Sequence, residues 1–308
     1  MHRPPTTGRS AGDPVHIRAP TWGGGGAAWV TLWRMVLAPG TVSPSLDRPS
    51  SARGEPGGGL VLAVAGAVGG AGASSLAVAL AVAARDGAAL VDLAGGGGID
   101  VLLGLEGAEG ARWPDLADAR GDVDPDLLVS SLPHRRGVSV LSADRRRPGP
   151  PDGGVVADVL RALGRRRRTV VVDAGRNEVP DAATHVVLVV PLTVPGLAGA
   201  LAWRAARTGA PAAATEPVEL VVTCGPAPGR LAPDDVATAL GVPVAAHVGR
   251  IRGARAAVER GDGPPVGHGT ALRRAAARVL DAAAARTAGP GAAGGWAATG
   301  RRAARAGR

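Results

Sequence analysis

A glycine-rich segment contains the residues best suited to chemistry. Glycines occur at positions 66, 69, 70 and 72, directly after an apolar run, and Ser74 and Ser75 open an Ala-rich stretch. A strand, a glycine turn and a helix start, in this order, present backbone N–H groups and the positive helix end to a phosphate. The Ser74 hydroxyl could cap the helix or coordinate Mg²⁺. The segment predicts a phosphate site, and a simple tight turn is the alternative.

Two carboxylates near the ends of apolar runs are candidates for catalysis or metal binding. Asp92 lies in the run 88–93, and Asp173 ends the run 169–173. A carboxylate at such a place also commonly caps the next helix, so that structural role is the alternative for both.

Alternating apolar and Ala-rich segments must position these residues. The apolar runs are 60–65, 88–93, 138–142, 169–173, 186–190, 219–223 and 242–248. The helical candidates are 74–85, 154–163, 196–207, 233–240, 253–260 and 270–286. Strands that are apolar on both faces and separated by helices predict an α/β domain over residues 59–287, with a mostly parallel sheet covered by helices on both faces.

The two ends of the chain differ from this pattern. Residues 1–58 are interrupted too often by Pro and Gly to sustain a helix or strand, so we expect a disordered, low-complexity arm. Residues 288–308 are predicted to form a basic tail of Gly, Ala and Arg. Two uncharged stretches, 60–84 and 186–203, are broken by Gly or Pro and predict strand, turn and helix rather than membrane spans.

The composition excludes several kinds of chemistry. All 35 cationic residues are Arg, so Schiff-base chemistry and an orthodox phosphate-loop lysine are excluded. The single cysteine, Cys224, excludes an intramolecular disulfide and multi-cysteine metal sites, and we expect it to be a small core residue at a strand end. The six histidines are scattered without helical ligand spacing, which argues against metal-dependent hydrolysis.

The net charge of +9 raises the question of nucleic acid. An inventory of Arg without Lys is also typical of a GC-biased genome, and the chain has few aromatic residues for stacking. We therefore do not expect nucleic acid as a specific partner, and an Arg-mediated nucleic-acid binding module stays an alternative. The run 165–168 is expected to be a solvated helix end.

Three motifs together resemble the MinD/ParA superfamily of P-loop NTPases. The family's deviant phosphate loop, Lys-Gly-Gly-Val-Gly-Lys-Thr-Thr, falls on residues 68–75, and the segments 90–94 and 98–106 resemble the second strand and switch. Asp173 lies where the family has its Walker B aspartate. The Gly-Gly-Ala-Gly-Ala-Ser core with Trp113 and the Pro-Asp-Leu that follows is most similar to the actinobacterial CpaE-like, septum-site-determining branch.

The resemblance implies a site for ATP with Mg²⁺. The nucleotide-binding residues would be Gly69, Gly70, Ala71, Gly72, Ala73, Ser74 and Ser75, with Ser74 and Asp173 on the metal and Asp92 positioning the nucleophile. The chain departs from the family because Val68 and Ala73 stand at the two lysine positions, and Ala94 at a frequent second acid. Losing two charge-assisted contacts would weaken nucleotide binding by about two to four powers of ten.

The same resemblance indicates function and partners. We expect a spatial regulator or scaffold for septum placement or for a pilus-like secretion system, with a weak Mg-ATP-dependent ATPase as the alternative. Partners would be division or secretion proteins, and a homodimer is a further family expectation. We expect a cytoplasmic chain. The last helix, 270–286, should pack on the sheet, and contact with the inner membrane face stays open because MinD proteins end in a basic amphipathic helix.

Overall fold

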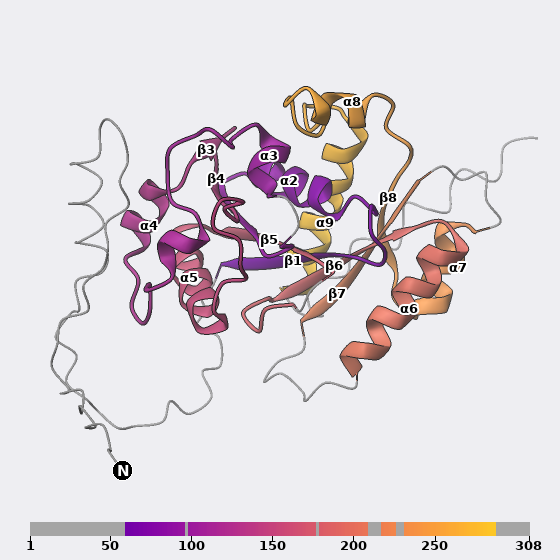
Figure 1. Ribbon diagram of the computed structural model, residues 1–308. Helices are drawn as coiled ribbons and strands as arrows, with labels where there is room; N and C mark the ends of the chain where they lie inside the picture. The colour runs from indigo at the N-terminus through magenta and orange to yellow at the C-terminus, as the bar shows by residue number, and fades with distance from the viewer. Residues whose placement is uncertain (1–58, 96–97, 177–178, 209–216, 226–230, 288–308) are drawn as a thin grey trace, which may run out of the picture. The chain divides into compact units, whose positions relative to one another are not determined.

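Eight strands form one sheet in the computed structural model, which describes residues 59–95, 98–176, 179–208, 217–225 and 231–287. Their order is β3-β4-β2-β5-β1-β6-β7-β8 (Figure 1). All neighbours pair in parallel except β3 and β4. The strands are β1 (Leu60–Gly66), β2 (Ala88–Asp92), β3 (His134–Arg135), β4 (Val138–Leu141), β5 (Thr169–Gly175), β6 (His185–Pro191), β7 (Val218–Cys224) and β8 (Val244–Val248).

The central strands are buried on both faces because most of their residues are small and apolar. β2 is buried over its full length, and β1, β5 and β6 are buried except at one or both terminal residues. Alternate residues of a strand point to opposite faces. Leu62 and Val64 of β1 accordingly join one core cluster, and Ala65 joins another. The predicted fold class, α/β with a mostly parallel sheet, is confirmed.

Helices cover both faces of this sheet (Figure 1). On one face, α2 (Ala73–Ala83) packs against α9 (Ala271–Thr287), and both share a core cluster with β1. On the other face, α6 (Val194–Thr208) and α7 (Pro233–Leu240) bury Ala200, Val236 and Leu240 against β6 and β7. α5 (Gly153–Arg166) packs against β5 and α4. The carboxyl ends of β1, β2 and β5 thus meet at one edge of the sheet.

Several short elements were not predicted from the sequence. They are α3 (Ile99–Leu103), the 3₁₀ turn η1 (Trp113–Leu116), α4 (Pro125–Ser131) and β3. α3 and β3 are too short to carry a periodic signal. α4, in contrast, begins with a recognisable helix-start signal. Asp124 accepts hydrogen bonds from Asp126 N and Leu127 N, and Pro125 occupies the first helical position.

The last helix packs on the domain, as the sequence predicts. Leu272, Ala276, Val279 and Ala283 are buried, and α9 contacts α2, β7 and β8. Within the described ranges, no helix combines the length and hydropathy needed to cross a bilayer. The predicted arm (1–58) and basic tail (288–308) lie outside the described residues.

Candidate nucleotide site

The glycine loop joins β1 to α2 and leaves open space in front of its backbone. Gly70 and Gly72 have φ angles of 73° and 91°, in the left-handed region that favours glycine. A Cβ atom added at Gly69, Gly70 or Gly72 would meet no atom within 4 Å. Gly72 is the N-cap of α2, and no side chain caps this helix start. The first turn of α2 therefore borders a cradle that is open to an anion.

The near side of the loop is fixed by packing against α6. Ala67 N donates to Val189 O at 2.9 Å. A Cβ atom at Gly199 of α6 would lie 2.5 Å from Ala67 O and 2.7 Å from Val68 Cγ1, so this approach requires glycine. Val68, at one of the two lysine positions of the resemblance, also packs against the core. The protein's own packing therefore sets the shape of the loop.

The structure brings Ser74 and Asp173 together beside the cradle. The Ser74 hydroxyl hydrogen-bonds to the Asp173 carboxylate, which also accepts from Gly175 N at 3.2 Å. Asp173 is only 2% exposed. Burial raises the pKa of Asp173 above its ordinary value, the Ser74 hydrogen bond lowers it in part, and the charge of Asp92 raises it further.

Asp92 is adjacent to Asp173 but is occupied by backbone hydrogen bonds. It is 3% exposed, and its two oxygens accept from Ala94 N at 3.0 Å and from Ile99 N at 2.9 Å. Burial raises its pKa, backbone N–H donors lower it in part, and the charge of Asp100 raises it. The Asp92 carboxylate thus caps the N-terminus of α3, which is the structural role that the sequence left open as an alternative. Each of the two oxygens thus already accepts one backbone hydrogen bond.

Trp113 fixes the backbone of the same strand end. Its Nε1–H donates to Asp92 O at 2.6 Å, and its side chain is 3% exposed. The tryptophan of the Trp-Pro-Asp-Leu motif is therefore a packing anchor that reaches the carbonyl of a candidate site residue.

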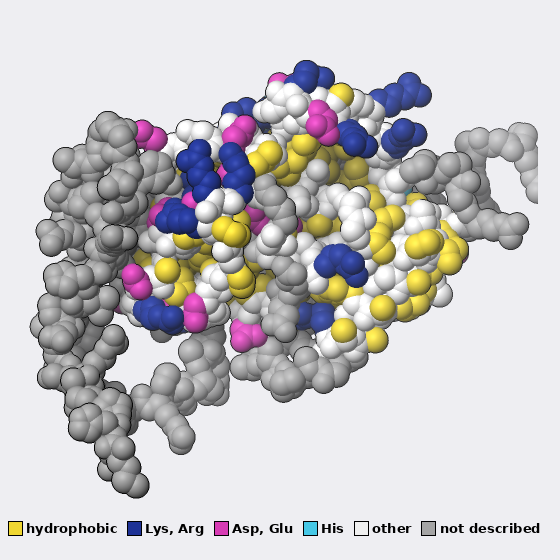
Figure 2. Space-filling model, in the orientation of Figure 1, with side chains coloured by type: hydrophobic (Ala, Val, Ile, Leu, Met, Phe, Trp, Pro, Cys, Tyr) yellow, Lys and Arg dark blue, Asp and Glu magenta, His cyan; other side chains and the backbone are white. Residues whose placement is uncertain are grey.

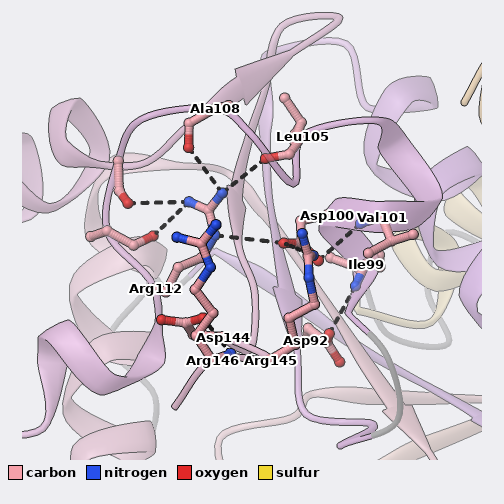
Figure 3. Close-up of polar contacts among 12 residues, drawn as sticks. Asp92, Ile99, Asp100, Val101, Leu105, Ala108, Arg112, Asp144, Arg145 and Arg146 are labelled. Atoms are coloured by element: carbon pink, nitrogen blue, oxygen red, sulfur yellow. Dashed lines mark hydrogen bonds and ion pairs between the residues drawn. The ribbon is translucent and has the colours of Figure 1, made fainter. Parts of the chain in front are cut away.

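A buried arginine, which sequence reasoning did not single out, organises the loop beyond α3 (Figure 3). Arg112 is 7% exposed, and its Nε lies 3.8 Å from Asp100 Oδ2. The exposed guanidinium of Arg145 lies 3.9 Å from the same oxygen. The guanidinium of Arg112 also donates to the carbonyl oxygens of Leu105, Ala108, Gly110 and Ala111. One buried cation therefore satisfies both an acid and a turn of backbone carbonyls.

A cavity of about 400 Å³ opens beside the glycine loop. The loop and α2 contribute one wall, and the ends of β7 and β8, α8 (Ala254–Glu259) and the segment before α9 contribute the others. Its lining is Ala71, Gly72, Ser75, Leu76, Leu102, Val189, Val222, Cys224, Gly225, Val248, Gly249, Ile251, Ala254, Arg255, Val258, Pro264, Pro265 and Leu272. A mostly apolar hollow that borders a cradle of amides is suited to a ligand with an apolar ring system and an anionic group.

Cys224 contacts the loop directly, beyond the core role that the sequence predicted. Its Sγ donates to Ala71 O at 3.2 Å, and its side chain lines the cavity. Burial raises the pKa of the thiol to about 11, so it is protonated near neutral pH. Its position at the end of β7 was predictable, whereas its contact with a loop 153 residues away was not.

Comparison of the sequence with known proteins finds uncharacterized relatives. No family model matches the chain. The chain is 46% identical over 198 residues to Rv3660c, an uncharacterized protein of Mycobacterium tuberculosis strain H37Rv, and matches the corresponding protein of strain CDC 1551 equally. The match covers 62% of this chain and 54% of the relative, so the chain spans about half the length of the curated relatives it matches.

Solved structures show a wider likeness. A ParA family ATPase from Chlorobium tepidum has a TM-score of 0.60 at 17% identity, over 74% of this chain and 98% of that one. The MinC:MinD cell division complex of Aquifex aeolicus has a TM-score of 0.53 at 18% identity, and the match covers 72% of this chain and 96% of that one. The septum site-determining protein MinD of Pyrococcus horikoshii, complexed with Mg-ADP, has a TM-score of 0.53 at 15% identity. The match covers 75% of this chain and 97% of that one. The chain therefore has the same α/β, P-loop NTPase-like fold as these structures.

Proposed function

We propose that the chain is a MinD/ParA-type protein of the CpaE-like branch that acts as a spatial regulator or scaffold. Its role would be in septum-site determination during cell division or in positioning a pilus-like secretion system. The shared fold supports this proposal, since MinD of Pyrococcus horikoshii is a septum site-determining protein and MinD of Aquifex aeolicus forms a cell division complex with MinC. Division or secretion proteins would be the partners, with a homodimer as the family's usual assembly.

The observation that carries the proposal is a cradle that is retained without lysine. The open space at Gly69, Gly70 and Gly72 is what a phosphate needs, because any side chain there would fill it. Val68 and Ala73, at the two lysine positions, offer no charge, and the whole chain contains no lysine. Each lost charge-assisted contact is worth about 1.5–3 kcal/mol, so micromolar affinity would fall to about 0.1–10 mM.

The residues present fit a magnesium ion that accompanies a nucleotide. Mg²⁺ commonly takes one or two protein oxygens and completes its shell with water and phosphate. The adjacent hydroxyl of Ser74 and carboxylate of Asp173 are such a pair, and the family structure with Mg-ADP supports this assignment. When bound, the ion would neutralise phosphate charge. Ser74 would coordinate the ion directly, and Asp173 would orient a water molecule bound to the ion. The hydrogen bond between Ser74 and Asp173 would be replaced by these contacts.

Hydrolysis is the second candidate function, and the site favours it less. The nearness of Asp92 and Asp173 supports a weak ATPase. Each oxygen of Asp92, however, already accepts a backbone hydrogen bond, from Ala94 N or Ile99 N, and these bonds hold the carboxylate in a structural role. Because phosphoryl transfer depends on positioning and charge stabilisation, we expect turnover to be slow or absent.

The nucleic-acid alternative gains little from the arginine run 165–168. Three of its members pair with acids, Arg165 with Asp122, Arg166 with Asp126 and Arg168 with Asp86. Their charge is thus partly neutralised within the domain, which supports a solvated structural role.

Two measurements test the proposed function. Titration calorimetry of Mg-ATP into the full chain should give weak binding that is lost in Gly72→Val, whose side chain would occupy the cradle and strain the loop at a φ of 91°. Melting curves must show that the variant is folded. A fluorescent fusion should concentrate at a septum or pole. Rapid ATP turnover by the purified chain would overturn the scaffold role. The expected Kd is about 0.1–10 mM, so the absence of binding heat at about 10 mM Mg-ATP would overturn the nucleotide site.

A further inference from the structure

The cavity beside the glycine loop has one charged side chain among its described lining residues, Arg255. The other lining residues are glycines, apolar side chains, Ser75 and the protonated Cys224. A ligand that places phosphates on the loop and a ring system in the cavity therefore meets a single described cation there. In a chain without lysine, arginine is the side chain that carries a permanent positive charge for phosphate.

Arg255 is free to serve a ligand. Its side chain is 93% exposed, and its contact is with Glu259 Oε1 at 3.7 Å, on an acid that is itself 69% exposed. Ion pairs of this kind contribute little to stability and break easily. The guanidinium can therefore turn toward an anion at little cost.

The surroundings of Arg255 are basic. Arg255 and Ile251 also line a neighbouring hollow of about 1010 Å³, together with Arg250, Arg252, Arg260 and the single acid Glu259. Figure 2 shows dark blue side chains gathered over α8 at the top of the molecule. A concave surface on which one sign of charge predominates raises the local concentration of oppositely charged ligands. Arg255 is the described arginine that belongs to both hollows.

Other arginines near this edge of the sheet pair with an acid or do not line the cavity. Arg112 is buried and satisfies Asp100 and four carbonyls, and Arg145 lies 3.9 Å from Asp100. Arg176 follows β5 and does not line the cavity. Of the described arginines, Arg255 is the one that lines the cavity.

We propose that Arg255 binds the phosphates of a nucleoside polyphosphate in this cavity and supplies the cationic contact that Val68 and Ala73 cannot. The inference rests on the proposed nucleotide site. A guanidinium can donate two parallel hydrogen bonds to a phosphate, so it replaces a lysine in charge and adds direction. The apolar walls contributed by Val222, Val248 and Pro264 would take the base.

The test compares Arg255→Gln with Arg252→Gln in the full chain. Arg252 is an exposed arginine of the same segment that lines only the basic hollow, so it controls for net charge. The probes are mant-ATP with Mg²⁺ and the uncharged mant-adenosine, followed by fluorescence at low ionic strength. Arg255→Gln should raise the Kd of mant-ATP by about 10-fold or more, from a lost charge-assisted contact of about 1.5–3 kcal/mol. Binding of mant-adenosine should not change.

The outcomes separate this inference from the proposed function. Arg252→Gln should change the Kd of mant-ATP much less than Arg255→Gln, and Arg255→Lys should restore part of the loss. Equal effects of the two Gln variants would mean a diffuse positive field and would overturn the role of Arg255. If Gly72→Val abolishes binding while Arg255→Gln leaves it intact, the nucleotide site stands and this inference fails. No mant-ATP binding by the natural sequence would overturn both. Both Gln variants should melt like the natural sequence because the side chains are exposed.

Discussion

Asp92 and Asp173 occupy the same register position on the adjacent parallel strands β2 and β5. Two buried carboxylates are thus neighbours at the edge of the sheet where the glycine loop begins. The loop and its acids form one unit, because Ser74 at the start of α2 hydrogen-bonds to Asp173. Burying two acids together costs folding energy, and such a cost is common at functional sites.

The first prediction concerns the pH dependence that this pair produces. Burial holds the pKa of Asp173 above its ordinary value of 3.8. The stabilisation from its bound proton is complete below pH 3.8 and is lost as pH rises through the folded-state pKa. Asp173→Asn is neutral at every pH and can still accept from Ser74. Urea denaturation should therefore show the variant gaining stability relative to the natural sequence as pH rises above 3.8.

The control for this prediction is Asp152→Asn, which should show the opposite sign. Asp152 is exposed at the N-cap of α5, and hydrogen bonds from Arg120, Gly154 N and Val155 N lower its pKa. The natural sequence should therefore gain stability relative to this variant as pH rises toward 3.8 and then keep it. A pH-independent difference for Asp173→Asn would contradict the burial argument.

The second prediction concerns the buried Arg112 (Figure 3). Arg112→Met should reduce the free energy of unfolding by about 3–5 kcal/mol, because it leaves Asp100 buried with a weaker partner and strips donors from four carbonyls. Arg145→Gln is the matched control. Its guanidinium is 51% exposed beside the same oxygen, so its loss should cost at most about 1 kcal/mol. Urea titration followed by circular dichroism measures both, and equal losses would show that burial is not the deciding factor.

The third prediction concerns the contact between α6 and the loop. Gly199→Ala places a methyl group 2.5 Å from Ala67 O, so backbone must move, and we expect a loss of about 1–3 kcal/mol together with weaker nucleotide binding. Gly69→Ala faces open space and should melt like the natural sequence. It should nevertheless weaken nucleotide binding, because its methyl group enters the cradle. Unchanged melting of Gly199→Ala would show that α6 does not fix the loop.

Much of the sheet could be predicted because its strands are apolar on both faces. The runs 60–65 and 186–190 fall within β1 and β6, and only their ends shift. The run 242–248 begins two residues before β8, because Gly241 caps α7 in the left-handed region and Pro243 precedes the first paired residue. The open glycine loop follows from the strand, turn and helix order in the same way.

The parts that could not be predicted depend on distant contacts. A single arginine at 112 has no pattern that marks it as buried, and its partner Asp100 lies in another segment. The sequence placed Asp92 at a strand end but left open whether it would cap or catalyse. Its hydrogen bond to Ile99 N crosses seven residues and decides its present role. The cavity that contains Arg255 is assembled from the glycine loop, three strands and several helices that are far apart in the sequence, so no local spacing could indicate it.

The last prediction uses Cys224, which is the chain's single cysteine and therefore gives an unmixed signal. Burial raises the pKa of its thiol to about 11, whereas a free thiol has a pKa of about 8.5. Its thiolate fraction at pH 8 is thus lower by about two powers of ten, and alkylation by iodoacetamide should be slower by at least that factor than for a peptide thiol. The rate should rise about tenfold per pH unit up to pH 10.

Because Cys224 lines the cavity and donates to Ala71 O, Mg-ATP should slow the reaction further. Fast alkylation at pH 8 would contradict the burial of the thiol, and a rate unaffected by saturating Mg-ATP would show that the ligand does not fill this cavity.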